Sequence, residues 1–306
     1  MPKHDFQQLT WNPQLEDDCR QLVRLAVRED LDRQADWTTL ATVTEAALGR
    51  ATMVARQPGV IAGLVTAPIV IDEMDIEAEW VTKVEDGARV SAGEPLAHFN
   101  GRARDLLTAE RLLLNFICHL SGIATLTASY VAAVQGTAAR IYDTRKTTPG
   151  WRRLEKYAVQ CGGGSNHRSG LYDAVLIKDN HRQYHQQQSA GDSTPADLVT
   201  QARDFLRESK ASDGPTLLEI EVDDLQQLEQ VLSASPDIVM LDNMTTDQLS
   251  AAVAQRNATA PETELEASGG ISLELVRAVA ETGVERISVG ALTHSAPSLD
   301  VALDWN

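Results

Sequence analysis

The sequence predicts an α/β protein with an N-terminal α/β sandwich domain and a C-terminal β/α barrel. After residue 137, short apolar runs alternate with helix-like segments, which is typical of βαβ units around a parallel sheet. Before that point, short strand-like runs with glycine turns precede one long helical stretch. We expect the sandwich domain to cover 1–125, with the tail 293–306 packing on it, and the barrel to cover 126–292.

The composition limits the classes of protein that need to be considered. The chain has 306 residues, 43% of them hydrophobic, which is enough for a sizeable core. Its formal net charge of -17 argues against a general binder of nucleic acid or anionic membranes, since these partners reward positive charge. The start, MPKHDFQQLTW, has no apolar signal-peptide region, and three widely spaced cysteines form no disulfide or zinc motif. We therefore expect a soluble, cytoplasmic protein.

The N-terminal elements can be assigned in order. Apolar residues at helical spacing predict a helix over 15–31, and the runs 51–64 and 77–99 are typical of short strands. A long helix is predicted over 102–135. Its polar residues form one continuous stripe, made of Arg104, Thr108, Arg111, Asn115 and His119. Such a stripe usually faces water, although a stripe that lines a polar cleft would show the same pattern.

Six strand-like runs follow: ARIYDTRK, DAVLIKDNH, LLEIEVDD, DIVMLDNM, TELEASGG and ERISVGALTH. We interpret none of them as having a period-two polar face, which fits strands buried on both sides. Each run ends in charged or small residues, and in a β/α barrel these carboxyl ends converge on the active-site face. A doubly wound open sheet would also bind ligands there. Because GxGxxG and GxxxxGK[ST] are both absent, we favour the barrel.

A basic segment lies within this acidic protein. Between residues 140 and 182 there are nine Lys or Arg residues against four Asp or Glu. Such an island can focus a small anion, although charge runs are often only solvated surface. The cations expected at strand ends or in the glycine-rich loop are Arg145, Lys146, His167, Arg168 and Lys178. Because an Arg fork can hold a carboxylate or phosphate through two hydrogen bonds, this group indicates a substrate with several negative charges.

Acidic and glycine-rich strand ends complete the predicted site. Glu221 and Asp242 end neighbouring strands, where their oxygens could hold Mg²⁺ beside phosphates or could simply neutralise the nearby cations. Two later strands end in glycine turns, whose backbone N–H groups suit a phosphate. The residues of these turns are Ser268, Gly269, Gly270 and Gly290. The chemistry predicted is therefore that of a polyanionic substrate with a terminal phosphate and Mg²⁺.

Several segments resemble the quinolinate phosphoribosyltransferase family (nicotinate-nucleotide pyrophosphorylase, carboxylating). The resemblance is carried by DTRKTTPGWRRLEKYAVQCGGGSNHRSGLYDAVLIKDNH, LLEIEVDDLQQL, DIVMLDNM, LEASGGISLELVRAVAETGV and ISVGALTHSAPSLDVALD, and it runs over nearly the whole chain. It implies a hammerhead-like N-terminal domain and an incomplete barrel of the type II phosphoribosyltransferase kind. It also implies transfer of phosphoribosyl from phosphoribosyl pyrophosphate to quinolinate with decarboxylation, giving nicotinate mononucleotide, pyrophosphate and CO₂. Mg²⁺ is the implied cofactor, and NAD biosynthesis is the implied process.

The resemblance also implies roles for the cationic residues. Arg145, Arg168 and Lys178 would hold the carboxylates of quinolinate, with His167 and Lys146 alongside. Lys146 and His167 also lie where the pyrophosphate is expected.

Further roles follow from the resemblance. Arg111 would reach the pyrophosphate across the interface of a homodimer, which could be part of a higher oligomer. Glu221 and Asp242 would meet the ribose hydroxyls and Mg²⁺, so that these two and Lys146 are the expected catalytic residues. The 5′-phosphate would lie against Ser268, Gly269, Gly270 and Gly290. The segment 186–195 looks like a surface insertion.

Three other functions compete with this one. A paralogous phosphoribosyltransferase could use another anionic base, such as nicotinate. A Schiff-base lyase could use Lys178 or Lys146 as its nucleophile, although both lie among guanidiniums suited to oxyanions. The segment EDGARVSAGEPL resembles the hairpins of biotinyl or lipoyl carriers, but no lysine lies at its tip.

Overall fold

The computed structural model describes residues 5–188, 194–209 and 217–305. Within this range the chain forms two compact units, each built from segments that are far apart in the sequence. The first unit holds the described parts of Met1–Gln8, Tyr130–Arg145 and Ser165–Gly290, and the second holds those of Leu9–Ser129, Lys146–Gly164 and Ala291–Asn306. The first unit carries a parallel sheet and the second an antiparallel one. The predicted α/β fold class is therefore confirmed.

Six strands form the sheet of the first unit, and every pairing between neighbours is parallel. In order across the sheet they are β6 (Arg140–Tyr142), β11 (Arg286–Ser288), β10 (Glu264–Ser268), β9 (Ile238–Asp242), β8 (Leu218–Val222) and β7 (Val175–Ile177). A parallel bridge between Tyr142 and Ser165 adds one further residue beside β6. Because the strands are parallel, all six carboxyl ends lie at the same edge.

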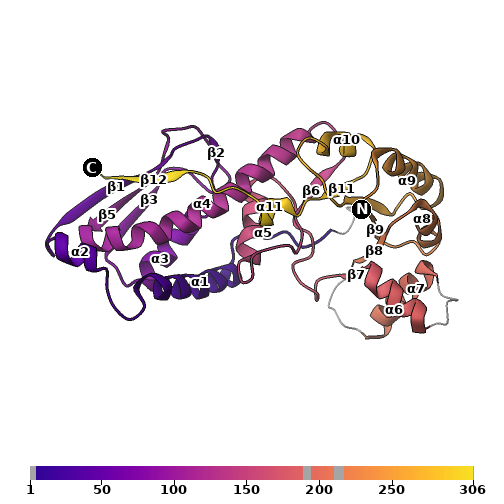
Figure 1. Ribbon diagram of the computed structural model, residues 1–306, viewed down its shortest axis with the longest axis horizontal. Coiled ribbons are helices and arrows are strands. Elements are labelled where there is room, and N and C mark those ends of the chain that lie inside the picture. Colours follow the sequence, from indigo (N-terminus) through magenta and orange to yellow (C-terminus); the bar gives the residue numbers. More distant parts are fainter. Residues whose placement is uncertain (1–4, 189–193, 210–216, 306) are drawn as a thin grey trace. The chain divides into compact units, whose positions relative to one another are not determined.

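Helices follow the strands of the first unit, as βαβ connections require. They are α6 (Asp179–Gln188), α7 (Pro195–Ser209), α8 (Leu225–Leu232), α9 (Thr246–Thr259) and α10 (Val276–Glu281). Helices α8 and α9 lie outside β8 and β9 (Figure 1). The side chain of Asp224 caps α8 by accepting from Gln227 N–H, and Thr245 and Gln248 form a capping box at α9. These short polar caps let α8 and α9 begin soon after β8 and β9.

The buried strands alternate in polarity, and here the sequence-based interpretation was wrong. In β8, Glu219 and Glu221 alternate with apolar residues, and in β10 Glu264 and Glu266 do the same. Successive side chains point to opposite faces, whereas residues paired in register share a face. Burial on both sides is confirmed for these strands. The error was to assume that a buried face must be apolar. Here Glu221 pairs with Lys178, and Glu264 and Glu266 pair with Arg286.

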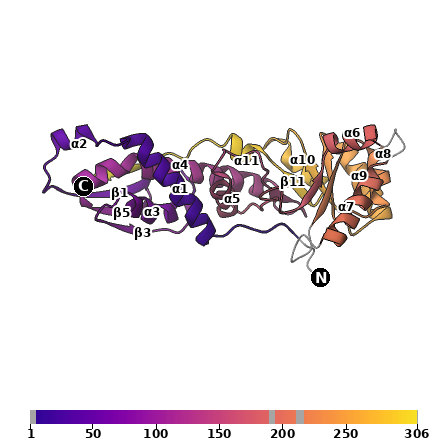
Figure 2. The ribbon, with the colours of Figure 1, turned by 90° about the horizontal axis from the view of Figure 1, so that it is seen from below.

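The second unit contains a four-stranded antiparallel sheet in the order β12-β1-β5-β3. Its strands are β1 (Leu48–Ala55), β3 (Ala78–Thr82), β5 (Pro95–Arg102) and β12 (Val301–Trp305), and β2 (Gly59–Val60) pairs separately with β4 (Arg89–Val90). Its helices are α1 (Pro13–Leu31), α2 (Trp37–Thr42), η1 (Leu64–Thr66), α3 (Ala67–Glu73), α4 (Ala103–Ala133), α5 (Arg152–Cys161) and α11 (Ala291–His294). Helices α1 and α3 lie side by side (Figures 1 and 2), joined by ion pairs from Arg20 to Asp72 and Glu73.

Helix α4 confirms the predicted long helix within a few residues at each end. It is long and apolar enough to span a membrane by length and composition alone, but 67% of its most apolar window is buried inside the fold. Leu106, Leu113, Ile117 and Leu120 are fully buried. These contacts explain the apolar composition as that of a core helix.

Two segments differ from the predicted domain division. The N-terminal segment joins the first unit, because Asp5 pairs with Arg140 and Arg286, and the side chain of Gln8 accepts from the Asn166 N–H. Residues 146–164 join the second unit, where α5 contacts α4 through His119 and Glu155. Both contacts are tertiary and span more than 30 positions, so local sequence patterns do not reveal them. Of the predicted insertion 186–195, residues 189–193 lie outside the described residues.

Candidate active site

The carboxyl edge of the parallel sheet brings most of the predicted site residues together. They follow or end six neighbouring strands: Arg145 after β6, Lys178 after β7, Glu221 in β8, Asp242 in β9, Ser268, Gly269 and Gly270 at β10, and Gly290 after β11. Since β10 and β11 are neighbours, the two glycine turns are adjacent. Cationic, acidic and glycine-rich elements therefore share one edge, as the sequence predicted.

Three carboxylates and one ammonium form the acidic part of this edge. Lys178 Nζ donates to Glu221 Oε2 at 2.7 Å. Oxygens of Glu221, Asp223 and Asp242 lie within 4.8 Å of one another. Burial raises the pKa of Asp242, and the neighbouring charge of Glu221 raises it further. Sequence reasoning missed Asp223, although it directly follows the strand that carries Glu221. The excess of negative charge suits a hard divalent cation.

The cationic part contains two arginines, Arg145 and Arg168, whose like charges interact. Arg168 is 6% exposed, and its Nη1 donates to the Ala174 carbonyl at 3.1 Å. Burial lowers the pKa of Arg168, and the like charge of Arg145 lowers it further. Among the described residues, Arg168 Nε has no hydrogen-bond partner although it is buried. A bound anion would satisfy this donor and relieve the repulsion between the two arginines.

His167 lies deeper than the sequence suggested. Its side chain is 5% exposed, and its Nε2 lies 3.1 Å from Glu219 Oε2 and 3.4 Å from Glu266 Oε1. Direct contact of His167 with a ligand therefore stays a prediction. Sequence reasoning missed the two buried glutamates, whose signal is the alternation of acidic and apolar residues in LEIEV and ELEAS.

The glycine turn after β10 is shaped by a close contact. Gly269 and Gly270 both have positive φ, at 97° and 61°. A Cβ on Gly269 would lie 2.2 Å from Asn243 Oδ1, whereas one on Gly270 would meet nothing within 4 Å. Asn243 itself has a φ of 54°, and its N–H donates to the Ser268 carbonyl at 2.9 Å. Asn243 thus fixes the turn predicted to hold a phosphate. The space beside Gly270 contains no other protein atoms within 4 Å of a Cβ position.

The three consecutive glycines serve packing within the second unit. A Cβ on Gly162 would lie 2.4 Å from the Ala124 carbonyl, and one on Gly164 would lie 2.7 Å from Thr127 Cγ2. Gly163 has a φ of 84°. The chain therefore ends α5, turns, and runs against α4 with no room for side chains.

Two predicted residues, Arg111 and Lys146, belong to the second unit. Both are exposed, Arg111 on α4 and Lys146 in the loop before α5, where its carbonyl accepts from Thr293 Oγ1. The stripe along α4 does not simply face water. Arg104 donates to the Val43 carbonyl, and His119 lies 3.0 Å from the buried Glu155. Arg111 itself is available for a contact outside this unit.

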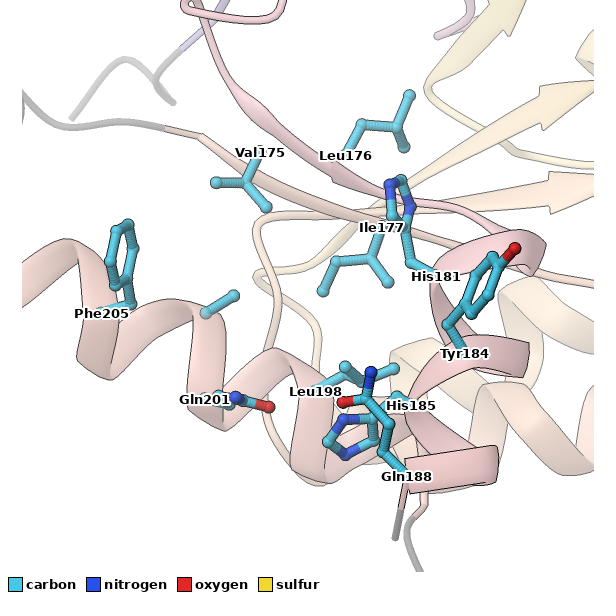
Figure 3. Close-up of a pocket in the computed structure, with 11 residues that line it drawn as sticks. Val175, Leu176, Ile177, His181, Tyr184, His185, Gln188, Leu198, Gln201 and Phe205 are labelled. Carbon is cyan, nitrogen blue, oxygen red and sulfur yellow. The ribbon is translucent and has the colours of Figure 1, made fainter.

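A separate groove of about 500 Å³ lies beside β7, between α6 and α7 (Figure 3). Val175, Ile177 and Leu198 form apolar parts of its lining, with Tyr184 and Phe205 at its rim. It contains none of the predicted site residues. The candidate site is therefore assigned to the strand ends, where the charged side chains gather.

Taken together, the parallel sheet, its cationic strand ends and its adjacent acidic trio define an enzyme class that handles small polyanions. Family models narrow this class. Residues 36–121 match the quinolinate phosphoribosyl transferase N-terminal domain, and residues 123–304 match the C-terminal domain. The chain belongs to the quinolinate phosphoribosyl transferase family.

Similarity to relatives extends over nearly the whole chain. It is 47% identical over 290 residues to the nicotinate-nucleotide pyrophosphorylase [carboxylating] of Mycobacterium leprae, covering 94% of this chain and 97% of the relative. The structure of the nicotinate-nucleotide pyrophosphorylase from Francisella tularensis superposes with a TM-score of 0.87 at 35% identity, covering 99% and 100% of the two chains. That from Ehrlichia chaffeensis gives 0.82 at 34% identity, covering 94% and 98%.

Asp242→Asn should stabilise the protein at neutral pH while impairing activity. Because the folded state raises the pKa of this carboxyl, its ionisation opposes folding above that pKa, and asparagine removes the cost. The gain in melting temperature should shrink as pH falls through the raised pKa, where the wild-type carboxyl becomes neutral. Thermal unfolding between pH 4 and 8 measures this.

The matched control is Asp204→Asn, whose side chain is 58% exposed on α7 and should change the melting temperature little. A lower melting temperature for Asp242→Asn at pH 7, or a difference independent of pH, would contradict the electrostatic account of this site.

Proposed function

We propose that this chain catalyses the reaction of its family: transfer of phosphoribosyl from phosphoribosyl pyrophosphate to quinolinate, with decarboxylation to nicotinate mononucleotide. The observation that supports it most is the repulsion between the charges of Arg145 and Arg168, together with the acidic trio on the same strand edge. Two neighbouring cations fit a substrate with two carboxylates, and carboxylates fit the metal that accompanies a pyrophosphate.

Quinolinate would bind at the cationic end of the strand edge. Arg145 and Arg168 would each hold a carboxylate, with the buried Arg168 Nε supplying one donor. Lys178 would swing from the buried Glu221 carboxylate toward the ligand, since the lysine side chain is itself 45% exposed. Two carboxylates on adjacent ring carbons would thus fix the orientation of the pyridine nitrogen.

The other substrate would occupy the acidic end and the glycine turns. Ser268, Gly269, Gly270 and Gly290 would surround the 5′-phosphate, and Glu221 with Asp242 would accept from the ribose hydroxyls. The oxygens of Glu221, Asp223 and Asp242 fit Mg²⁺, which prefers hard oxygen ligands and keeps several waters. When bound, Mg²⁺ would supply positive charge for the departing pyrophosphate.

The chemistry needs positioning more than covalent participation. The pyridine nitrogen attacks ribose C1 and the bond to pyrophosphate breaks, which leaves the ring nitrogen positively charged. The bond between ring C2 and its carboxylate then breaks, CO₂ leaves, and the electron pair stays on C2 next to that charge until a proton replaces it. Arg145, Arg168 and Lys178 hold the ring while the charge is redistributed, so preorganised cations lower the barrier.

We propose that the chain forms a homodimer in which each subunit contributes a residue to the active site of the other. Arg111 is exposed on α4 and carries a charge suited to pyrophosphate, and Lys146 follows Arg145 directly. We propose that Arg111 acts from the partner subunit and Lys146 from the same one. The proposed place of action is the cytoplasm.

Arg168→Ala should raise the KM for quinolinate by about 10- to 100-fold, because it removes charged hydrogen bonds worth about 1.5–3 kcal/mol. The KM for phosphoribosyl pyrophosphate should change far less. Steady-state assays of nicotinate mononucleotide and CO₂ measure both, with Arg207→Ala on exposed α7 as the control. An unchanged KM for quinolinate contradicts the site assignment. If the wild type makes no product from quinolinate, or prefers nicotinate without CO₂ release, the proposed reaction is wrong.

At a quinolinate concentration near the wild-type KM, Arg111→Ala and Arg168→Ala chains should each show little activity. Mixing the two chains there should restore about a quarter of wild-type activity if sites are shared across a dimer. Half of randomly formed dimers would be mixed, and one of the two sites in each would carry both arginines. Activity after mild denaturation and joint refolding measures this. Failure of the mixture to regain activity, when each chain alone refolds, would mean that Arg111 serves its own subunit or neither.

A further inference from the structure

A histidine lies between two buried carboxylates on the inner face of the parallel sheet. His167 Nε2 is 3.1 Å from Glu219 Oε2 and 3.4 Å from Glu266 Oε1, and both glutamates are fully buried. Burying a carboxylate costs several kcal/mol unless it is paired. Packing alone therefore does not explain why two buried carboxylates lie beside one imidazole.

Glu266 is the more firmly anchored of the two. Its Oε2 accepts from Arg286 Nε at 3.0 Å, and its Oε1 accepts from the hydroxyl of Ser288. Arg286 is itself held, since it lies over the ring of Tyr142 at 3.8 Å and donates to Glu264 at 3.1 Å. Glu266 is therefore a fixed hydrogen-bond acceptor.

The other ring nitrogen of His167 faces the backbone. Nδ1 accepts from the N–H of Arg168 at 2.8 Å. A nitrogen that accepts carries no proton, so the ring proton lies on Nε2, which faces the glutamates. On the opposite side, Asp143 Oδ1 accepts from the His167 N–H at 2.8 Å. The backbone that leads into Arg168 is thus held from two directions.

We propose that Glu266 is a positioning residue for carboxylate recognition: by keeping the His167 proton on Nε2, it leaves Nδ1 to accept the Arg168 amide and so sets where the Arg168 guanidinium lies. The inference rests on the proposed function for the identity of the ligand, quinolinate. Replacing buried ion pairs by apolar residues often leaves stability unchanged, so stability alone does not explain this network. The proposal gives the network a role in substrate specificity instead.

Glu266→Gln tests this directly, because it keeps the shape and replaces an acceptor by an amide. With the amide oxygen accepting from Arg286, the amide N–H₂ of the variant would lie toward Ser288 and His167 Nε2. It would then donate to Nε2, which favours the His167 tautomer with its proton on Nδ1. That tautomer cannot accept from the Arg168 amide. The expected result is a rise in the KM for quinolinate of about five- to tenfold, with the KM for phosphoribosyl pyrophosphate within about twofold.

Glu264→Gln is the matched control. Glu264 lies on the same strand and accepts from the same Arg286, and its carboxylate pairs with Arg286 and Arg140. It should lower the melting temperature while leaving the KM for quinolinate unchanged. Equal effects of the two variants on stability, with no effect of either on quinolinate, would overturn the proposal.

A second measurement depends neither on enzyme activity nor on normal folding of the Glu266→Gln variant. In ¹⁵N-histidine-labelled protein, with signals assigned through His167→Asn, the wild-type His167 should show a protonated Nε2 and an unprotonated Nδ1. Ser288→Ala, which removes one anchor of Glu266, should shift these signals and raise the KM for quinolinate by about two- to threefold. A protonated Nδ1 in the wild type would refute the inference even if the proposed reaction is correct. If the tautomer is as expected but the protein does not catalyse the reaction, only the proposed reaction is refuted.

Discussion

The neutralisation of buried charge on the inner face of the parallel sheet is the constraint on which the first unit depends. Arg286, which is fully buried, holds Glu264, Glu266 and Asp5 with hydrogen bonds of 3.0–3.1 Å. Removing one partner of such a set would leave an unpaired buried charge, which costs about 3–5 kcal/mol. Because Asp5 takes part, the N-terminal segment must join this unit for the charges to balance.

This polar layer connects the core to the strand edge. The outer faces of β8 and β10 carry Ile220, Leu265 and Ala267, which are buried under the helices, so the strands cannot slip by one residue without burying acids there. With register fixed, Glu219 and Glu266 meet His167, and two residues further along the same strands Glu221 and Ser268 reach the edge. Packing on one face thereby determines chemistry on the other.

Sequence patterns predicted the strand ends well, because charge and glycine after an apolar run are local signals. Arg145, Lys178, Glu221 and Asp242 lie at one edge because parallel strands must end there. The partners of His167 were not predicted, although the alternation in LEIEV and ELEAS was visible, because it was discounted for buried strands. Other features were out of reach: the close contacts of Gly162 with Ala124, and of Asp5 with Arg286, join segments separated by 38 and 281 positions. Such pairs depend on tertiary packing, which no local pattern encodes.

The fold keeps the like charges of Arg145 and Arg168 within interaction range, and we propose that a dianion neutralises both. Thermal unfolding with increasing quinolinate, compared with nicotinate at equal concentrations and constant ionic strength, tests it most directly. Ligand that binds only the folded state raises the melting temperature according to its affinity. Quinolinate, with two carboxylates, should stabilise the protein clearly more than nicotinate, and added salt should reduce the difference only partly because Arg168 is buried. Equal stabilisation by the two ligands, or none by quinolinate, would contradict the claim.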